Sequence, residues 1–167
     1  MLTIYIMFLS FNNKFNIKLF FISGLILIVQ INFPSIIILE DQKISLDLIL
    51  IFLTILVFTK STYKIIFLAF IFGIIQDLVV GVNQIGLISF IKSLTVFILL
   101  FLRSYDTIWN INLKLFFVFL VYLFHYLFFY LVIYNQMHGI ILILSLIQTI
   151  ISISILYLFN RFLIFIK

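Results

Sequence analysis

Residues 72–92 read FGIIQDLVVGVNQIGLISFIK, and this stretch decides the fold that we expect for the chain. Two apolar runs are joined by a short polar turn, and one carboxylate, Asp77, lies within the first run. The turn carries a glycine at each end, Gly81 and Gly86. Glycine tolerates positive φ angles and lets backbones approach closely, as a tight connection between membrane helices requires. The stretch therefore predicts a helical hairpin at one face of a membrane, with Asp77 near its tip.

The composition of the whole chain is that of an integral membrane protein. Of its 167 residues, 66% are hydrophobic and only 9% are charged, whereas soluble domains are about 45–50% apolar and about 25% charged. A hydrocarbon core about 30 Å thick needs about 20 residues per helix, so the chain has room for roughly five to seven spans in a single domain. An ionised residue at the centre of such a span costs about 2.5–3.5 kcal/mol. We therefore expect Asp77 to serve packing, a partner or a pathway.

The apolar runs predict an all-α, polytopic membrane domain that covers residues 1–167 and has six transmembrane helices. Residues 1–11 are apolar but too short to span, and they predict an interfacial anchor. The polar interruptions between the longer runs place the spans at about 16–33, 44–58, 63–80, 85–102, 113–134 and 140–158.

Polar residues mark the boundary between the first two spans. Pro34 either ends the first span or kinks it, because a helix through Pro34 would leave the carbonyl of Gln30 without its usual donor. Residues 35–39 are mostly apolar and β-branched, and the charged residues that follow mark a return to water. Asp47 falls in the first turn of the second span, where a carboxylate complements the helix dipole and can reach the interface.

The basic residues separate by side if successive loops alternate across the membrane. One face receives eight of the ten Lys and Arg residues, the other receives Lys43 alone, and Lys92 lies within a span. Basic loops stay in the cytoplasm, so both termini are predicted to be cytoplasmic and the Asp77 hairpin tip to face outward. The basic residues are scattered singly and do not predict a nucleic-acid-binding face. The eight are Lys14, Lys18, Lys60, Lys64, Arg103, Lys114, Arg161 and Lys167.

The sequence contains no convincing constellation for catalysis, and we expect no catalytic residue, no metal and no cofactor. The chain has no cysteine, which excludes disulfides and thiolate metal sites, and it lacks HExxH and GxSxG motifs. A relay through His125 needs partners one turn away on the same helix face. Tyr122 is one such partner, but the position one turn later is Phe129. His125 is therefore predicted to be a hydrogen-bonded packing residue, and His138 a solvated turn residue.

Asp77 and Lys92 leave two interpretations open. The long stem of Lys92 can snorkel back to the level of Asp77, so the geometry allows an ion pair across the hairpin. Equally, each side chain can simply reach interfacial water. Gln76 and Gln84 are either donors to another helix or polar ends of spans, and the second is the commoner case.

The hairpin motif resembles that of a known family. Residues 73–81, GIIQDLVVG, followed by Gly86-Leu87, are similar to the G-x-x-x-D-L-x-x-G…G-L signature of the bacterial rod shape-determining protein MreD. Gly81 and Gly86 are separated by four residues where three are usual in that family.

The residues around the motif extend the resemblance. Pro34 near the end of the first span, Asp47-Leu48 at the start of the second, the size and the basic cytoplasmic side are all similar to MreD. The likeness covers most of the chain to about Leu102. The chain departs from the family in Leu46, where a proline is common, and in Lys92.

The resemblance implies a non-enzymatic, multi-pass scaffold of the cell-elongation machinery in the bacterial cytoplasmic (inner) membrane. MreD-like proteins lie beside MreC, whose single spanning helix leads to a periplasmic domain. They help couple the MreB filament to a RodA-type glycosyltransferase and its class B penicillin-binding partner, and so support peptidoglycan synthesis and cell shape. A partner helix docks where small and polar residues let backbones approach, since lipid offers no hydrophobic drive between helices. The predicted docking or packing residues are Gly73, Gln76, Asp77, Leu78, Gly81, Gly86 and Leu87, and the predicted structural residues are Gln30, Pro34, Asp47 and Lys92.

Two other interpretations remain open. The main rival is a substrate-binding subunit of an energy-coupling-factor vitamin transporter, because such subunits have a similar size, span number and fold. They resemble one another in an A-x-x-x-A face on the first helix, whereas Ala69 is the only alanine here and the first span offers only Ser23 and Gly24. The third interpretation is a membrane enzyme that acts on lipid, for which the sequence lacks a polar constellation.

Overall fold

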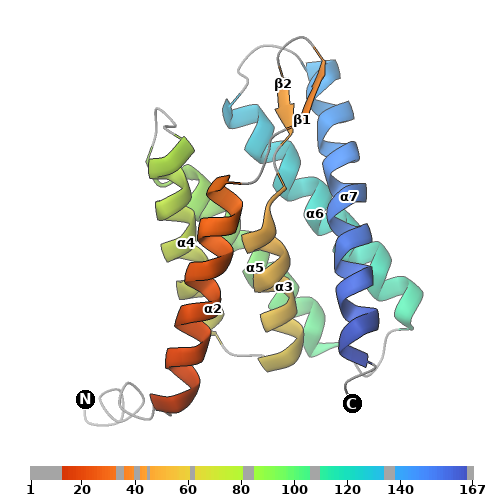
Figure 1. The fold of residues 1–167 in the computed structure, drawn as a ribbon. Coiled ribbons are helices and arrows are strands. Elements are labelled where there is room, and N and C mark those ends of the chain that lie inside the picture. Colours follow the sequence, from red (N-terminus) through yellow and green to blue (C-terminus); the bar gives the residue numbers. More distant parts are fainter. Residues whose placement is uncertain are drawn as a thin grey trace, which may run out of the picture.

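The computed structural model describes residues 13–32, 36–39, 42–44, 46–60, 63–80, 85–105, 110–133 and 138–164. Within these residues the fold is all-α apart from one small β-hairpin, and the predicted number of six helices is confirmed (Figure 1). Pro34, Gly81, Gln84 and the proposed anchor at 1–11 lie outside the described residues. The helices are α2 (Asn13–Asn32), α3 (Leu48–Lys60), α4 (Lys64–Val80), α5 (Leu87–Ser104), α6 (Ile111–Ile133) and α7 (His138–Ile164).

Three of the helices are long and apolar enough to cross a membrane, as expected for a membrane protein. The segments that meet this criterion are Leu87–Ser104, Asn112–Ile133 and Gly139–Phe159. In contrast, α3 has only 13 residues and is about 20 Å long, which is shorter than a hydrocarbon core of about 30 Å. The six spans and the cytoplasmic termini therefore stay predictions.

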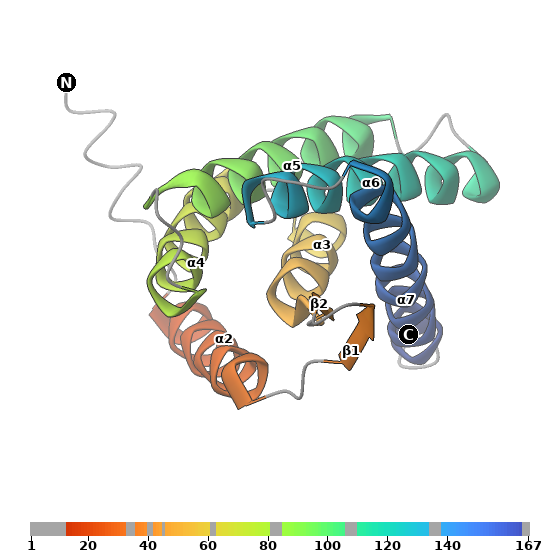
Figure 2. The ribbon, with the colours of Figure 1, turned by 90° about the horizontal axis from the view of Figure 1, so that it is seen from above.

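Helix α3 lies at the centre of the bundle, and the other five helices are arranged around it (Figure 2). It packs against α2, α4, α5 and α7. Its apolar residues Leu50, Leu53 and Val57 are fully buried. The start of α3 is consequently enclosed by other helices.

A β-hairpin leads into α3 and corrects one predicted boundary. Strand β1 (Ile36–Leu39) pairs antiparallel with β2 (Gln42–Ile44), with Ile36 opposite Ile44. The second span was expected to begin at residue 44, but α3 begins at Leu48. The β-branched isoleucines of β1 favour a strand over a helical connection.

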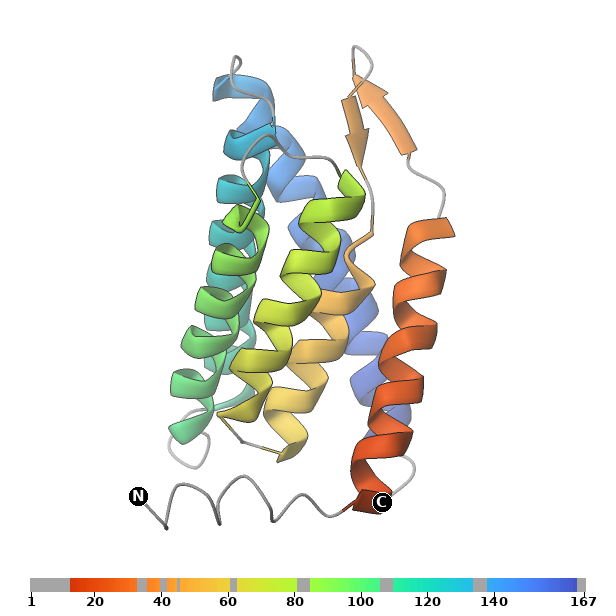
Figure 3. The ribbon, with the colours of Figure 1, turned by 90° about the vertical axis from the view of Figure 1, so that its left-hand side faces the viewer.

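The two ends of the bundle differ in the elements that they carry. The β-hairpin, the end of α4 and the start of α5 lie at one end, and the start of α2 and the end of α7 lie at the other, which we call the terminal side (Figures 1 and 3). Lys60, Lys64 and Lys114 all lie at or near the helix ends on the terminal side, with Arg103 close to the end of α5. Arg103 donates a hydrogen bond to the carbonyl of Val57 near the end of α3, where a cation is favoured by the helix dipole. Four of the eight basic residues predicted for one face therefore lie toward the same end of the described bundle, and the orientation of that end relative to the cytoplasm stays a prediction.

Candidate functional site

The carboxylate of Asp77 caps the start of α5. Oδ2 of Asp77 accepts from the backbone N–H of Gly86 at 3.0 Å and from the hydroxyl of Ser89 at 2.9 Å, and Oδ1 accepts from the N–H of Ile88 at 3.0 Å. The first N–H groups of a helix have no partner within the helix and carry partial positive charge. Asp77, in the last turn of α4, therefore supplies the cap that α5 needs. We call Asp77 and its three partners the hairpin cap.

Two glycines make the hairpin cap possible. At Gly73, a Cβ atom would lie 2.1 Å from the Cα of Ser89, so a side chain there would overlap the backbone of α5. Gly86 has a φ of 106°, in the left-handed region that glycine adopts most readily. The positive φ expected of a turn glycine is present at Gly86, whereas the close approach of the two helices occurs at Gly73, outside the turn.

The remaining motif residues differ in exposure. Leu78 is 64% exposed and points away from the bundle interior. Leu87 is half-buried. Gln76 is buried, and its Oε1 has no hydrogen-bond donor among the described residues. The docking role of the motif residues stays a prediction. Both carboxylate oxygens of Asp77 already accept hydrogen bonds from residues at the start of α5.

Lys92 pairs with Asp47. The sequence had left open two other possibilities for Lys92, an ion pair with Asp77 or contact with interfacial water. The Nζ atom of Lys92 lies 2.8 Å from Oδ1 and 2.7 Å from Oδ2 of Asp47. Both side chains are buried, and that of Lys92 is 0% exposed. Because α3 begins inside the bundle, the carboxylate of Asp47 at its start contacts Lys92 and not water. Neither alternative left open for Lys92, a pair with Asp77 or contact with interfacial water, describes this buried pair, and the carboxylate of Asp47 is buried rather than at the interface.

Asp47 also holds the start of α3. Its Oδ1 accepts from the N–H of Leu50 at 3.0 Å, and its carbonyl accepts from the N–H of Ile51. The predicted place of Asp47 at a helix start is therefore confirmed. Gln30 contributes from α2, since its Oε1 accepts from the N–H of Ile49 at 2.9 Å.

His125 of α6 completes a group that we call the charged cluster: Asp47, Lys92 and His125. The Nε2 atom of His125 lies 3.7 Å from Oδ2 of Asp47. Its Nδ1 lies 2.9 Å from the hydroxyl of Thr95 on α5. His125 is hydrogen-bonded and packed, as predicted, but it is not isolated. The polar neighbours of His125 lie on other elements, at Thr95 and Asp47, and not one turn away on its own helix.

Further buried hydroxyls connect the helices. The Tyr122 and Thr54 hydroxyls lie 2.8 Å apart and join α6 to α3. Tyr126 and Ser152 lie 2.7 Å apart and join α6 to α7. A third contact joins the same two helices, in which Tyr130 donates to Gln148. The three tyrosines recur every four residues, and this spacing was a usable sequence signal for an interior polar face.

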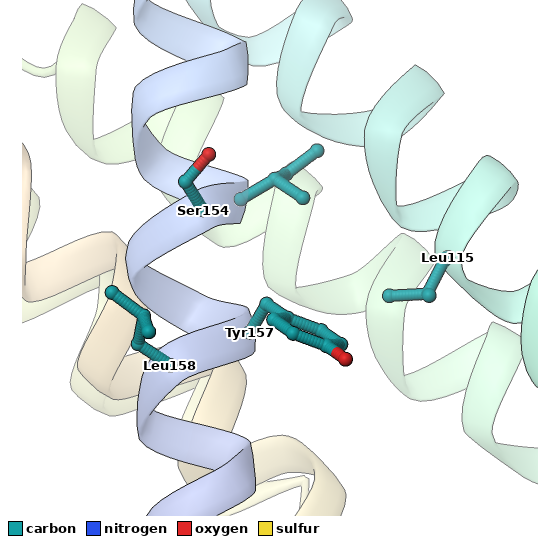
Figure 4. Close-up of a pocket in the computed structure, with 5 residues that line it drawn as sticks. Leu115, Ser154, Tyr157 and Leu158 are labelled. Carbon is teal, nitrogen blue, oxygen red and sulfur yellow. The ribbon is translucent and has the colours of Figure 1, made fainter.

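The described residues also form an apolar groove between α6 and α7, toward the terminal end of the bundle (Figure 4). Tyr157 extends across it in the direction of Leu115. Small-molecule sites combine such surfaces with several convergent polar groups, and only Ser154 and Tyr157 carry polar atoms here. Among the described residues, no group of three or more His, Cys, Asp or Glu side chains could hold a metal ion. The lining residues are Leu115, Ile153, Ser154, Tyr157 and Leu158.

The chain matches no protein-family model, no curated protein and no solved structure. The features that bear on its function are the hairpin cap, the charged cluster and the motif resemblance.

Proposed function

We propose that this protein is a non-enzymatic scaffold of a bacterial cell-elongation complex, similar to MreD, that supports an MreC-like partner and peptidoglycan synthesis from the cytoplasmic membrane. The observation that carries the proposal is the hairpin cap. The residues that resemble the MreD signature are not a generic apolar run, because Gly73, Asp77 and Gly86 each have a defined geometric task in one hairpin.

The hydrogen bonds that the buried polar groups form between helices also favour a scaffold. Apart from Gln76 and one atom of His125, the buried side-chain polar atoms described have hydrogen-bond partners, and many of these contacts cross from one helix to another. In a membrane, helices are held together by close packing and by hydrogen bonds rather than by a hydrophobic drive. Groups used in this way stabilise a fixed shape, which is what a docking platform needs.

The partner in this proposal is a single spanning helix that packs beside the exposed side of α4. Leu78 is the exposed member of the described motif residues, and it follows the buried Asp77 directly. The hairpin cap then fixes the angle between α4 and α5 without itself touching the partner. This revises the predicted docking surface, since Asp77 acts through the shape of the hairpin.

Photocrosslinking from single positions tests the proposal. A photoreactive residue at position 78 should capture an MreC-like protein in the source bacterium. The same residue at position 150, which is exposed on α7, serves as the matched lipid-facing control. Equal capture from both positions, or capture of lipid alone from position 78, would contradict docking at α4. A vitamin that co-purifies tightly with the protein would instead favour the transporter subunit.

A further inference from the structure

The charged cluster is more than a structural ion pair. We infer that Asp47, Lys92 and His125 form a buried proton-binding site, in which Nε2 of His125 takes up a proton beside the carboxylate of Asp47. The inference is independent of the proposed scaffold function.

The hydrogen-bond partners of Asp47 leave one place for a donor. Oδ1 accepts from the Leu50 N–H and from Lys92, whereas Oδ2 accepts from Lys92 and faces Nε2 of His125 at 3.7 Å. Nε2 is fully buried and has no hydrogen-bond partner among the described residues. An unprotonated Nε2 would put two acceptors face to face in a low-dielectric interior, where polar groups without partners are strongly disfavoured. Because the Thr95 hydroxyl donates to the carbonyl of Ile91, the proton of a neutral ring lies on Nδ1, and a second proton, on Nε2, makes the contact with Asp47 favourable.

Thr95 allows His125 to gain or lose a proton without a movement of heavy atoms. The Thr95 hydroxyl lies 2.7 Å from the carbonyl of Ile91 and 2.9 Å from Nδ1 of His125, and it carries a single hydrogen. When it donates to Ile91, it accepts from a protonated Nδ1. When it donates to Nδ1, the ring carries its proton on Nε2. Rotation of one hydroxyl therefore accommodates either neutral tautomer and the doubly protonated ring.

The two charges that act on His125 have opposite signs. The carboxylate of Asp47, which precedes α3, favours a proton on the ring, and the ammonium group of Lys92, on α5, opposes it. Lys92 also interacts electrostatically with Asp77 of α4. Two neutral phenols on α6 lie nearby, Tyr122 and Tyr126. The described side chains of α2 and α7 include no Asp, Glu, Lys or Arg. Ionisable groups that face one another inside a membrane bundle are typical of proton-binding sites.

Nitrogen NMR of the full chain tests the inference. The chain contains two histidines, so His138→Gln leaves His125 as the single ¹⁵N-labelled imidazole. We expect its two nitrogen signals to change from one protonated nitrogen to two as the pH is lowered across the range in which the chain stays folded. An imidazole that stays neutral, or stays fully protonated, throughout that range would overturn the inference. This measurement needs no change in the charged cluster, so a variant that fails to fold cannot obscure it.

Charge removal then identifies the residues that set the proton affinity. In the His138→Gln background, Asp47→Asn should weaken proton binding by His125 about tenfold or more, and Lys92→Met should strengthen it by a similar factor. Lys64→Met, near the opposite end of the bundle, serves as the matched control and should leave the titration unchanged. Shifts of the same sign for the two cluster variants, or a shift as large in the control, would show that the cluster is not the site.

Discussion

The hairpin cap and the charged cluster are both built around a buried aspartate that caps the start of a helix, yet they differ in what neutralises the carboxylate. Asp77 is held by three backbone N–H groups, at Gly86, Ile88 and Ser89, and by the hydroxyl of Ser89. Asp47 is held by one backbone N–H and by the ammonium group of Lys92. The carboxylate of Asp77 is stabilised by the dipoles of backbone N–H groups, and that of Asp47 is stabilised mainly by the full positive charge of Lys92.

This difference predicts how strongly a side-chain substitution destabilises each site. Dipoles of the α5 backbone cannot be removed by a side-chain substitution, so the environment of Asp77 is robust. The partner of Asp47 is a single side chain, and its loss would leave an uncompensated charge in the bundle. We therefore expect the charged cluster to be the more fragile of the two sites.

The largest effect is expected for Lys92→Met. Removal of one partner of a buried ion pair leaves the other charge unpaired and costs about 3–5 kcal/mol of unfolding free energy. Replacement of both partners, in Asp47→Asn with Lys92→Met, should cost much less than the sum of the two single losses. Unfolding in detergent micelles measures all three variants. Losses that simply add would mean that the Asp47–Lys92 pair contributes no coupling.

A smaller loss is expected for Asp77→Asn. The amide keeps one acceptor oxygen but loses the charge, and hydrogen bonds to a charged group contribute about 1.5–3 kcal/mol. The neighbouring exposed residue provides the control, since Leu78→Ala should change the unfolding free energy by less than about 0.5 kcal/mol. If Asp77→Asn destabilises more than Lys92→Met does, the ranking of the two sites is reversed.

Gly73→Ala tests the same hairpin through packing rather than charge. The added methyl group would meet the backbone of Ser89, so α4 and α5 must move apart, and overpacking of this kind costs about 1–3 kcal/mol. At Gly24 of α2, a Cβ would meet nothing within 4 Å, so Gly24→Ala is a matched control that should be neutral or slightly stabilising in a helix. Thermal unfolding of both variants separates a specific overlap from a general effect of alanine.

The sequence predicted the hairpin that carries Asp77, although not its capping of α5, and it did not predict the charged cluster; the distances along the chain explain the difference. Asp77 and its partners lie within twelve residues, inside one recognisable motif. The partners of Asp47 are 45 residues away at Lys92 and much farther at His125. No local spacing connects three separate elements, so a search on one helix face could not bring them together. The β-hairpin was also missed, since residues 35–39 were described only as apolar and β-branched and no strand was predicted there.

The smallest effect is expected for Tyr126→Phe. Its hydrogen bond joins two uncharged hydroxyls, so its contribution can be compared with those of the charged contacts of Asp77 and Asp47. The variant removes one hydroxyl from the contact with Ser152 between α6 and α7 and leaves the ring in place. Hydrogen bonds between membrane helices contribute about 0.6 kcal/mol on average, because the unfolded chain in the membrane also finds partners. A double-mutant cycle with Ser152→Ala measures the interaction itself. If its coupling energy equals that of the Asp47–Lys92 pair, full charges add nothing over neutral hydroxyls in this bundle, and the contrast between the two aspartates would have to rest on geometry alone.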